Sequence, residues 1–169
     1  HVCNYLLRRY AQRIGFDNNF TILDQEDAKG LLKIARNDYK DELGEYGNNL
    51  PKENVIMKVI SYSSNTLKSL RESILEIAPY LIEFEYDIET IWQKYVALKK
   101  EIKAMDYDDI LVNTAMLLRT NPDLMSYVSS QYKYVLVDEF QDTNKIQLEI
   151  VEALSHVNRN LICVGDDAQ

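Results

Sequence analysis

Apolar residues recur every three or four positions along most of the first 130 or so residues. This spacing predicts amphipathic helices that each bury one face. The first helix carries Leu6, Leu7, Tyr10 and Ile14 on one side, and we expect it to end near Gly15. Most of the chain is therefore expected to be helical.

A second helix is predicted to begin at Asp24, whose side chain can accept from free backbone amides, while Asp27 adds negative charge in the first turn. Residues 41–51 contain two glycines and a proline and favour a loop. The helical pattern resumes after Pro51, although VIMKVI at 55–60 would also suit a short strand.

Further helices are predicted at about residues 66–78 and 86–104. The second of these has an apolar stripe that we expect to pack in the core, made of Ile88, Ile91, Trp92 and Tyr95. Two later helices are expected to have Asp106 and Asn121 as their N-terminal caps, with Asp109 following the first cap by three residues.

The last part of the chain has a different pattern. Two short apolar runs, 134–137 and 161–164, read as strands, and the helical pattern of 145–157 separates them. Strand, helix and strand in this order predict two parallel strands joined by a right-handed crossover. Asp142 or Thr143 is expected either to cap the intervening helix or to belong to a functional loop.

The predicted fold class is mainly α with a small α/β part. Runs that are apolar throughout are typical of a parallel sheet that is covered on both faces. Because two strands cannot make such a sheet alone, we expect these two to belong to a larger one.

Composition is that of a soluble globular protein, with 46% hydrophobic residues. No apolar run approaches the roughly 18 residues of a membrane helix, so we expect a cytoplasmic protein without a membrane partner. Cys3 and Cys163 lie far apart without metal-binding spacing, and we expect both to be reduced and structural.

The formal net charge of −8 argues against a general basic footprint for nucleic acid. Any contact with DNA would be local. The basic residues form two clusters on predicted helices, which we expect to be mainly solvated helix faces: Arg8, Arg9 and Arg13, and Lys99, Lys100 and Lys103.

Acidic residues follow both predicted strands directly. Asp138 and Glu139 come after the first strand, and Asp166 and Asp167 come after the second. Parallel strands bring these groups to one edge of a sheet, where ligands gather. Mg²⁺ with a nucleotide suits such carboxylates, and an Asp after an aliphatic strand is the Walker B arrangement. By itself, however, VLVDE fits an acidic helix cap equally well.

The longer string is more specific. DEFQDTN at 138–144, followed by a second strand ending in VGDDAQ at 164–169, resembles motifs II and III of superfamily 1 DNA helicases of the UvrD/Rep/PcrA type. FTILDQED, MDYDDIL and VCNYLLRRYA resemble further segments of the same family. The resemblance therefore covers both ends of the chain and points between them.

The resemblance implies roles for individual residues. The family's Mg²⁺ ligand falls on Asp138, and Glu139 beside it becomes the second carboxylate of the metal site and the base that activates water. Gln169 matches the glutamine that senses the γ-phosphate of ATP. Gln141 belongs to the same nucleotide site, where it and Asp142 look more like supports for the loop.

The resemblance also implies a domain layout. Residues 1–15 would be a helix of a RecA-like domain 1A, residues 16–104 a helical insertion called 1B, and residues 105–169 a second segment of domain 1A. No G-x-x-x-x-G-K-[ST] motif occurs in the sequence. We therefore expect an internal fragment that holds two strands of an incomplete P-loop NTPase sheet and is inactive alone.

Two classes of function remain open at this point. The first is an ATP-dependent 3′-to-5′ DNA helicase that unwinds duplex DNA in repair or replication, with single-stranded and duplex DNA and repair or replication proteins as partners. The second is a non-catalytic helical module that binds duplex DNA or a protein. An acidic-cluster nuclease would need further metal ligands, and none has suggestive spacing.

Overall fold

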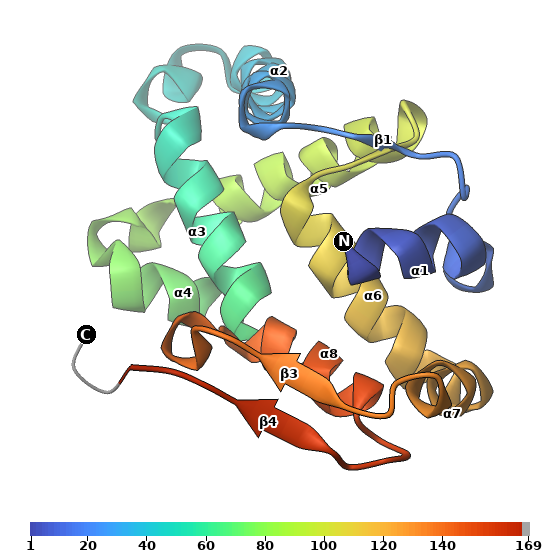
Figure 1. The fold of residues 1–169 in the computed structure, drawn as a ribbon. Coiled ribbons are helices and arrows are strands. Elements are labelled where there is room, and N and C mark those ends of the chain that lie inside the picture. The colour runs from blue at the N-terminus through green and yellow to red at the C-terminus, as the bar shows by residue number, and fades with distance from the viewer. Residues whose placement is uncertain (167–169) are drawn as a thin grey trace. The chain divides into compact units, whose positions relative to one another are not determined.

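The computed structural model describes residues 1–166, which are mainly helical with two small parallel sheets (Figure 1). The expected fold class is confirmed. The chain divides into two compact units, one of Asn19–Asp109 and one of His1–Asn18 with Ile110–Gln169. Within the described residues, no helix is long and apolar enough to cross a membrane.

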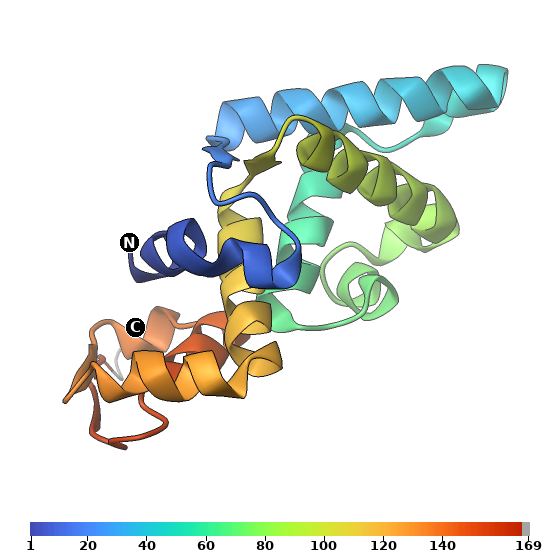
Figure 2. The same ribbon diagram turned by 90° about the vertical axis from the view of Figure 1, so that its right-hand side faces the viewer.

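The Asn19–Asp109 unit, which we call the insertion unit, is a helical bundle. Its helices are α2 (Gln25–Leu43), α3 (Glu53–Thr66), α4 (Leu70–Ile77) and α5 (Glu85–Glu101), with 3₁₀ turns η2 (Gly44–Asn49) and η3 (Pro79–Phe84). Figure 2 shows α2 and α5 running along one another. The core takes apolar residues from all four helices: Leu32, Ala35, Ile56, Val59, Ile74, Ile88, Ile91 and Tyr95.

Local sequence explains where these helices begin and end. The Asp24 side chain accepts from the Asp27 backbone amide at 2.9 Å, as predicted. Residues 55–60 lie in α3, so they are not a strand. The loop expected at 41–51 is wrong in part, because α2 continues to Leu43 and η2 follows it.

Two very short strands join the ends of the insertion unit and were not predicted. β1 (Thr21–Ile22) and β2 (Ala104–Met105) pair in parallel, with Thr21 opposite Ala104 and Ile22 opposite Met105. Neither strand is long enough to show a period of two in the sequence. The pair places the segment that enters the unit beside the segment that leaves it.

The other unit, which we call the strand unit, combines helices with the second sheet. Its elements are α1 (Val2–Tyr10), η1 (Ala11–Ile14), α7 (Pro122–Ser130), β3 (Val135–Val137), η4 (Phe140–Asp142), α8 (Lys145–Leu154) and β4 (Leu161–Cys163). Helix α6 (Tyr107–Thr120) has its first turn in the insertion unit and the rest here. Gly15 ends η1 in the left-handed conformation, with φ of 81°.

The predicted helix caps in this unit are right only in part. Asn121 is the N-cap residue of α7, as predicted, but its side chain makes no capping hydrogen bond and instead donates to the Leu117 carbonyl at the end of α6. Helix α8 is capped by Asn144, and neither Asp142 nor Thr143 does so. Asn144 and Gln147 form a reciprocal capping box, with both hydrogen bonds at 3.0 Å.

The second sheet has the predicted parallel pairing. Val135, Leu136 and Val137 lie opposite Leu161, Ile162 and Cys163. One face is open, because Leu136 is 71% exposed and Ile162 is 48% exposed. The expected cover on both faces is thus absent within residues 1–166. Both cysteines are free as predicted, but Cys163 is exposed and does not help to pack a core.

Candidate functional site

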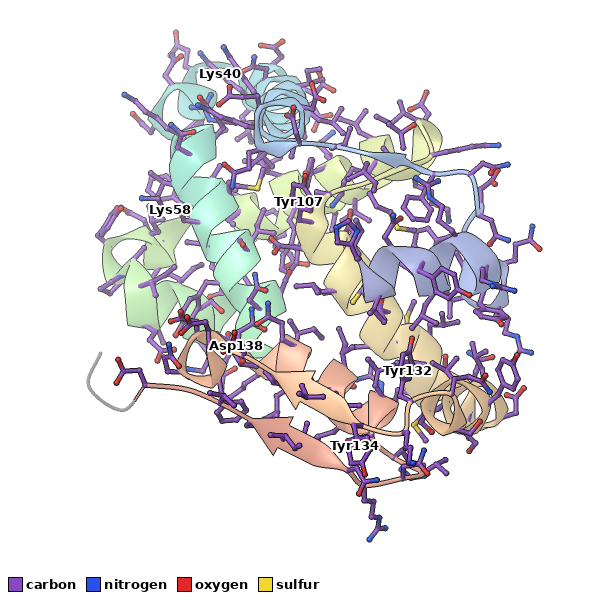
Figure 3. The ribbon with its side chains drawn as sticks, viewed as in Figure 1. Lys40, Lys58, Tyr107, Tyr132, Tyr134 and Asp138 are labelled. Carbon is purple, nitrogen blue, oxygen red and sulfur yellow. The ribbon has the colours of Figure 1, made fainter. Side chains whose placement is uncertain are left out.

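Asp138 is the first residue after β3, and Figure 3 shows it at the opposite end of that strand from Tyr134. Its side chain is exposed, and one carboxylate oxygen, Oδ1, accepts from the Glu139 backbone amide at 3.0 Å. Because the residue as a whole is exposed, a ligand in solution has access to it.

Glu139 has an unusual backbone conformation. Its φ of 50° and ψ of 46° lie in the left-handed region, where a residue with a side chain is strained by about 1–3 kcal/mol. Such strain is common at functional sites. The Glu139 side chain accepts from Gln141 Nε2 at 2.6 Å, which holds the carboxylate beside the loop.

The loop after β3 is tied to the end of β4. The backbone amide of Phe140 donates to the Val164 carbonyl at 2.9 Å, and that of Val164 donates to the Val137 carbonyl at 2.8 Å. Gln141 extends this connection, since its Oε1 accepts from the Asp166 amide at 3.0 Å. Gln141 thus joins the acids that follow the two strands.

Gly165 permits this close approach and was not singled out in the sequence. A Cβ atom there would lie 2.7 Å from Gln141 Oε1 and 3.4 Å from the Gln141 amide nitrogen. The first distance is shorter than van der Waals contact allows. The available sequence signal was a glycine between an apolar strand and two acids, which marks close backbone approach.

Within the part of the chain that the structure describes, the two acids of the loop have no basic side chain beside them as an ion-pair partner. Among residues 1–166, neither Asp138 nor Glu139 forms an ion pair with Lys, Arg or His. The same residues contain no group of three or more His, Cys, Asp or Glu placed to hold a metal ion. Mg²⁺ held by one protein carboxylate, water and phosphate oxygens needs no such group.

Two hollows differ in what lines them. An open depression of about 350 Å³ beside the loop is lined by Phe140, Gln141, Cys163, Gly165 and Asp166. A cleft of about 470 Å³ in the insertion unit includes the sides of α3 and the start of α6, where Figure 3 labels Lys58 and Tyr107. We assign the chemistry to the loop after β3, because Asp138 and Glu139 form no ion pair with another side chain among residues 1–166.

The basic clusters are not all surface features. The expectation of a solvated face is wrong for Lys99, which is only 5% exposed and pairs with Asp106 and Asp109. Lys100 is exposed, as are Arg8 and Arg9. A signal was present in the sequence, since Lys99 lies on the same helix face as Tyr95, four residues earlier.

Two of the predicted site residues, Asp167 and Gln169, lie outside the described residues. The others that the structure describes, Asp138, Glu139 and Gln141, lie together in one loop joined by hydrogen bonds.

Comparison with known proteins shows which family the chain belongs to. The family described as "UvrD/REP helicase N-terminal domain" matches residues 1–169. The chain belongs to the UvrD/REP helicase family. It is 31% identical over 168 residues to a protein named ATP-dependent DNA helicase PcrA from Staphylococcus aureus strain Mu50. It is 30% identical over 168 residues to the protein of that name from Staphylococcus epidermidis strain ATCC 12228.

Each of these alignments covers 99% of this chain and 22% of the relative. The chain therefore spans about a fifth of the length of these PcrA helicases. Its match to the UvrD/REP helicase family includes the loop after β3 and both flanking strands.

Proposed function

We propose that this chain is part of an ATP-dependent DNA helicase, which couples ATP hydrolysis to 3′-to-5′ translocation on single-stranded DNA and to unwinding of duplex DNA. DNA repair or replication is the proposed setting. The observation that carries the proposal is the exposed pair Asp138 and Glu139, which lies at the carboxyl end of a parallel strand and forms no ion pair with a cation among residues 1–166. Membership of the UvrD/REP helicase family supports it.

Asp138 is proposed as the Mg²⁺ ligand. Mg²⁺ keeps several waters and takes one or two protein carboxylates together with substrate phosphates. The exposed Asp138 carboxylate suits this mode, since within residues 1–166 it accepts a single hydrogen bond, from the next amide. When bound, the ion would neutralise charge that develops on the phosphates of ATP.

Glu139 is proposed as the base that orients the attacking water and accepts its proton. The water oxygen forms a bond to the γ-phosphorus, the bond to the ADP oxygen breaks, and the proton passes to the Glu139 carboxylate. The bond from Gln141 Nε2 holds that carboxylate in place. Gln169 is proposed to contact the γ-phosphate.

The sequence contains no phosphate-binding loop motif. That loop is proposed to lie elsewhere in a longer protein, since this chain covers 22% of the length of the relatives. Without such a loop, the chain alone is proposed not to hydrolyse ATP. Its open sheet face, with Leu136 and Ile162 exposed, leaves room for further structure to pack there.

The test is Glu139→Gln in the full-length protein that contains this chain. The change keeps size and hydrogen bonding but removes the ability to accept a proton, so DNA-stimulated ATP hydrolysis should fall by about 100- to 10,000-fold. Glu152→Gln is a matched control, because Glu152 is an exposed residue on α8 of the same unit. Its turnover should equal that of the parent.

The alternative is a non-catalytic helical module that binds duplex DNA or a protein. Unchanged turnover in Glu139→Gln would remove the catalytic role of this loop. Absence of DNA-stimulated hydrolysis in the unaltered full-length protein would favour the module directly.

A further inference from the structure

Helix α5 has an outer face that carries apolar side chains. Tyr86 is 77% exposed and Val96 is 46% exposed, and Glu89 and Gln93 lie between them at helical spacing. Trp92, the only tryptophan of the chain, is partly buried beside this face. The core of the insertion unit takes other residues of the same helix, namely Ile88, Ile91 and Tyr95.

Two depressions follow this outer face of α5. One of about 580 Å³ is lined by the start of α4, by η3 and by the start of α5, and one of about 280 Å³ lies farther along α5. Glu89 lines both depressions, so they form one continuous surface, which we call the α5 track. Its apolar and aromatic lining residues are Leu70, Ile82, Tyr86, Trp92 and Val96.

The charges of the α5 track are mainly negative. Its one cation within residues 1–166, Arg71, pairs with Glu85. Glu83 and Glu89 form no ion pair with another side chain in that range. Glu89 accepts from Gln93 Nε2 at 3.1 Å, but this neutral donor leaves the charge of the carboxylate in place. The track therefore has two carboxylates without a matching cation.

This combination of side chains favours protein over nucleic acid. Phosphates would be repelled by the carboxylates, because binding to nucleic acid depends on Lys and Arg. Tyr and Trp are enriched in protein interfaces, and a hollow that runs along a surface suits the apolar side of an amphipathic helix. Cations on that helix would match the carboxylates of the track.

We propose that the α5 track is a docking site for a basic, amphipathic segment of a partner protein. The apolar side chains of the segment fill the two depressions against Tyr86 and Trp92. Its Lys or Arg side chains lie against Glu83 and Glu89, and this complementary charge speeds association. The proposal goes beyond helicase activity and does not depend on ATP hydrolysis.

The experiment uses the full-length protein that contains this chain and two synthetic peptides. Each peptide is an amphipathic helix of about 18 residues, close to the length of α5. One is built from Leu and Lys, and the other has Glu in place of every Lys. Binding is followed by fluorescence anisotropy of the labelled peptide, and the site is mapped by amide hydrogen exchange.

For the basic peptide we expect a Kd below about 100 μM, and for the acidic peptide a Kd at least about tenfold higher. Bound basic peptide should slow amide exchange at residues 82–96. Raising the salt concentration to about 0.5 M should weaken binding severalfold, because salt screens exposed charges.

A matched pair of variants tests the charge. Glu89→Lys places a cation where both depressions meet, so it should weaken binding of the basic peptide at least about tenfold. Glu26→Lys changes the net charge equally, but Glu26 is an exposed residue that lines the other cleft of the insertion unit. Its Kd should stay within about twofold of that of the parent.

A second pair tests the aromatic contact. Tyr86→Ala removes an exposed ring from the track and should weaken binding at least about fivefold. Tyr46→Ala is its control, since Tyr46 is 83% exposed and lies in η2, outside the track. Because both rings are exposed, neither change is expected to unfold the protein.

Four results would overturn the proposal. The first is no binding of the basic peptide, which is also the result expected if another part of the longer protein covers the track. The second is equal binding of the two peptides. The third is an equal loss of binding in Glu89→Lys and Glu26→Lys, which would mean attraction to net charge alone. The fourth is slowed exchange outside residues 82–96 only.

Discussion

The molecule contains two pairs of acids that follow short parallel strands, and they differ in what surrounds them. Asp106 and Asp109 follow β2, are largely buried, and share the Lys99 ammonium. Asp138 and Glu139 follow β3, are exposed, and have no ion-pair partner among residues 1–166. Similar local sequence thus leads to two different electrostatic situations.

The difference teaches where a ligand can act. A buried carboxylate must find its partner inside the fold, since burial of an unpaired charge is costly. An exposed carboxylate is stable in water and remains free to bind a cation from solution. The first pair is therefore a structural joint, and the second is the candidate site for Mg²⁺ and ATP.

The largest effect on stability is expected from removing the internal cation. Lys99→Met would leave the buried Asp106 and Asp109 carboxylates uncompensated and should lower the free energy of unfolding by about 3–5 kcal/mol. Urea denaturation of the chain measures this. Lys100→Met should change it by less than about 0.5 kcal/mol. Equal losses of unfolding free energy in Lys99→Met and Lys100→Met would show that the buried ion pairs matter no more to stability than an exposed lysine does.

A smaller loss of stability is expected at Gly165, which lies against the Gln141 side chain beside the exposed pair. Gly165→Ala introduces a Cβ atom 2.7 Å from Gln141 Oε1, so the Gln141 side chain must move away from Asp166. Because the clash is with the end of a flexible side chain, the cost is mainly that of the lost hydrogen bond to the Asp166 amide, about 0.5–1.5 kcal/mol in the free energy of unfolding. In the full-length protein, ATP hydrolysis should fall as well. A variant with full stability and turnover would show that this contact positions nothing.

The buried pair should also make stability depend on pH in a defined direction. The pKa of Asp109 is raised in the folded state by burial and by the Asp106 carboxylate, so its contribution is present at low pH. That contribution is lost as pH rises from the unfolded pKa of about 3.9 through the folded value. Asp109→Asn should remove this loss.

The measurement is urea denaturation at a series of pH values above 4. Asp106 has the opposite effect on the pH dependence of stability, because its pKa is lowered in the folded state. Its contribution is present above the pKa of the unfolded chain and is lost on acidification. A steeper decline of stability with rising pH in Asp109→Asn would contradict the assignment.

The smallest effect is expected at the exposed pair itself. Asp138→Ala removes a carboxylate that has one hydrogen bond, to a neighbouring amide. The free energy of unfolding should change by less than about 0.5 kcal/mol. A loss of several kcal/mol would mean that Asp138 is a structural residue like Asp106.

Sequence reasoning predicted the features that depend on neighbouring residues. The Gly15 terminus, the Asp24 cap and the parallel pairing of the runs at 134–137 and 161–164 are all present. The spacing of Asn144 and Gln147 is that of a capping box, and the structure has this box in place of the caps expected at Asp142 or Thr143.

Features that depend on distant residues could not be predicted in the same way. The pairing of β1 with β2 joins segments more than eighty residues apart, and two residues show no periodicity. The helix face that Lys99 shares with Tyr95 indicates burial, but the pairing of Lys99 with Asp106 and Asp109 depends on how these acids face α5, which no local pattern reveals. At the candidate site, Asp138 and Glu139 were indicated by their place after an aliphatic strand and Gln141 by the family resemblance. The role of Gly165 became visible only through the contact with Gln141.

The central claim is that Asp138 is exposed in order to hold a metal ion with a nucleotide. The most direct test uses Mn²⁺ in place of Mg²⁺ and follows its magnetic resonance signal in the full-length protein with a non-hydrolysable ATP analogue. We predict nucleotide-dependent Mn²⁺ binding in the parent and in Glu152→Gln, and binding at least about tenfold weaker in Asp138→Asn. Binding of equal strength in Asp138→Asn and the parent would contradict the account.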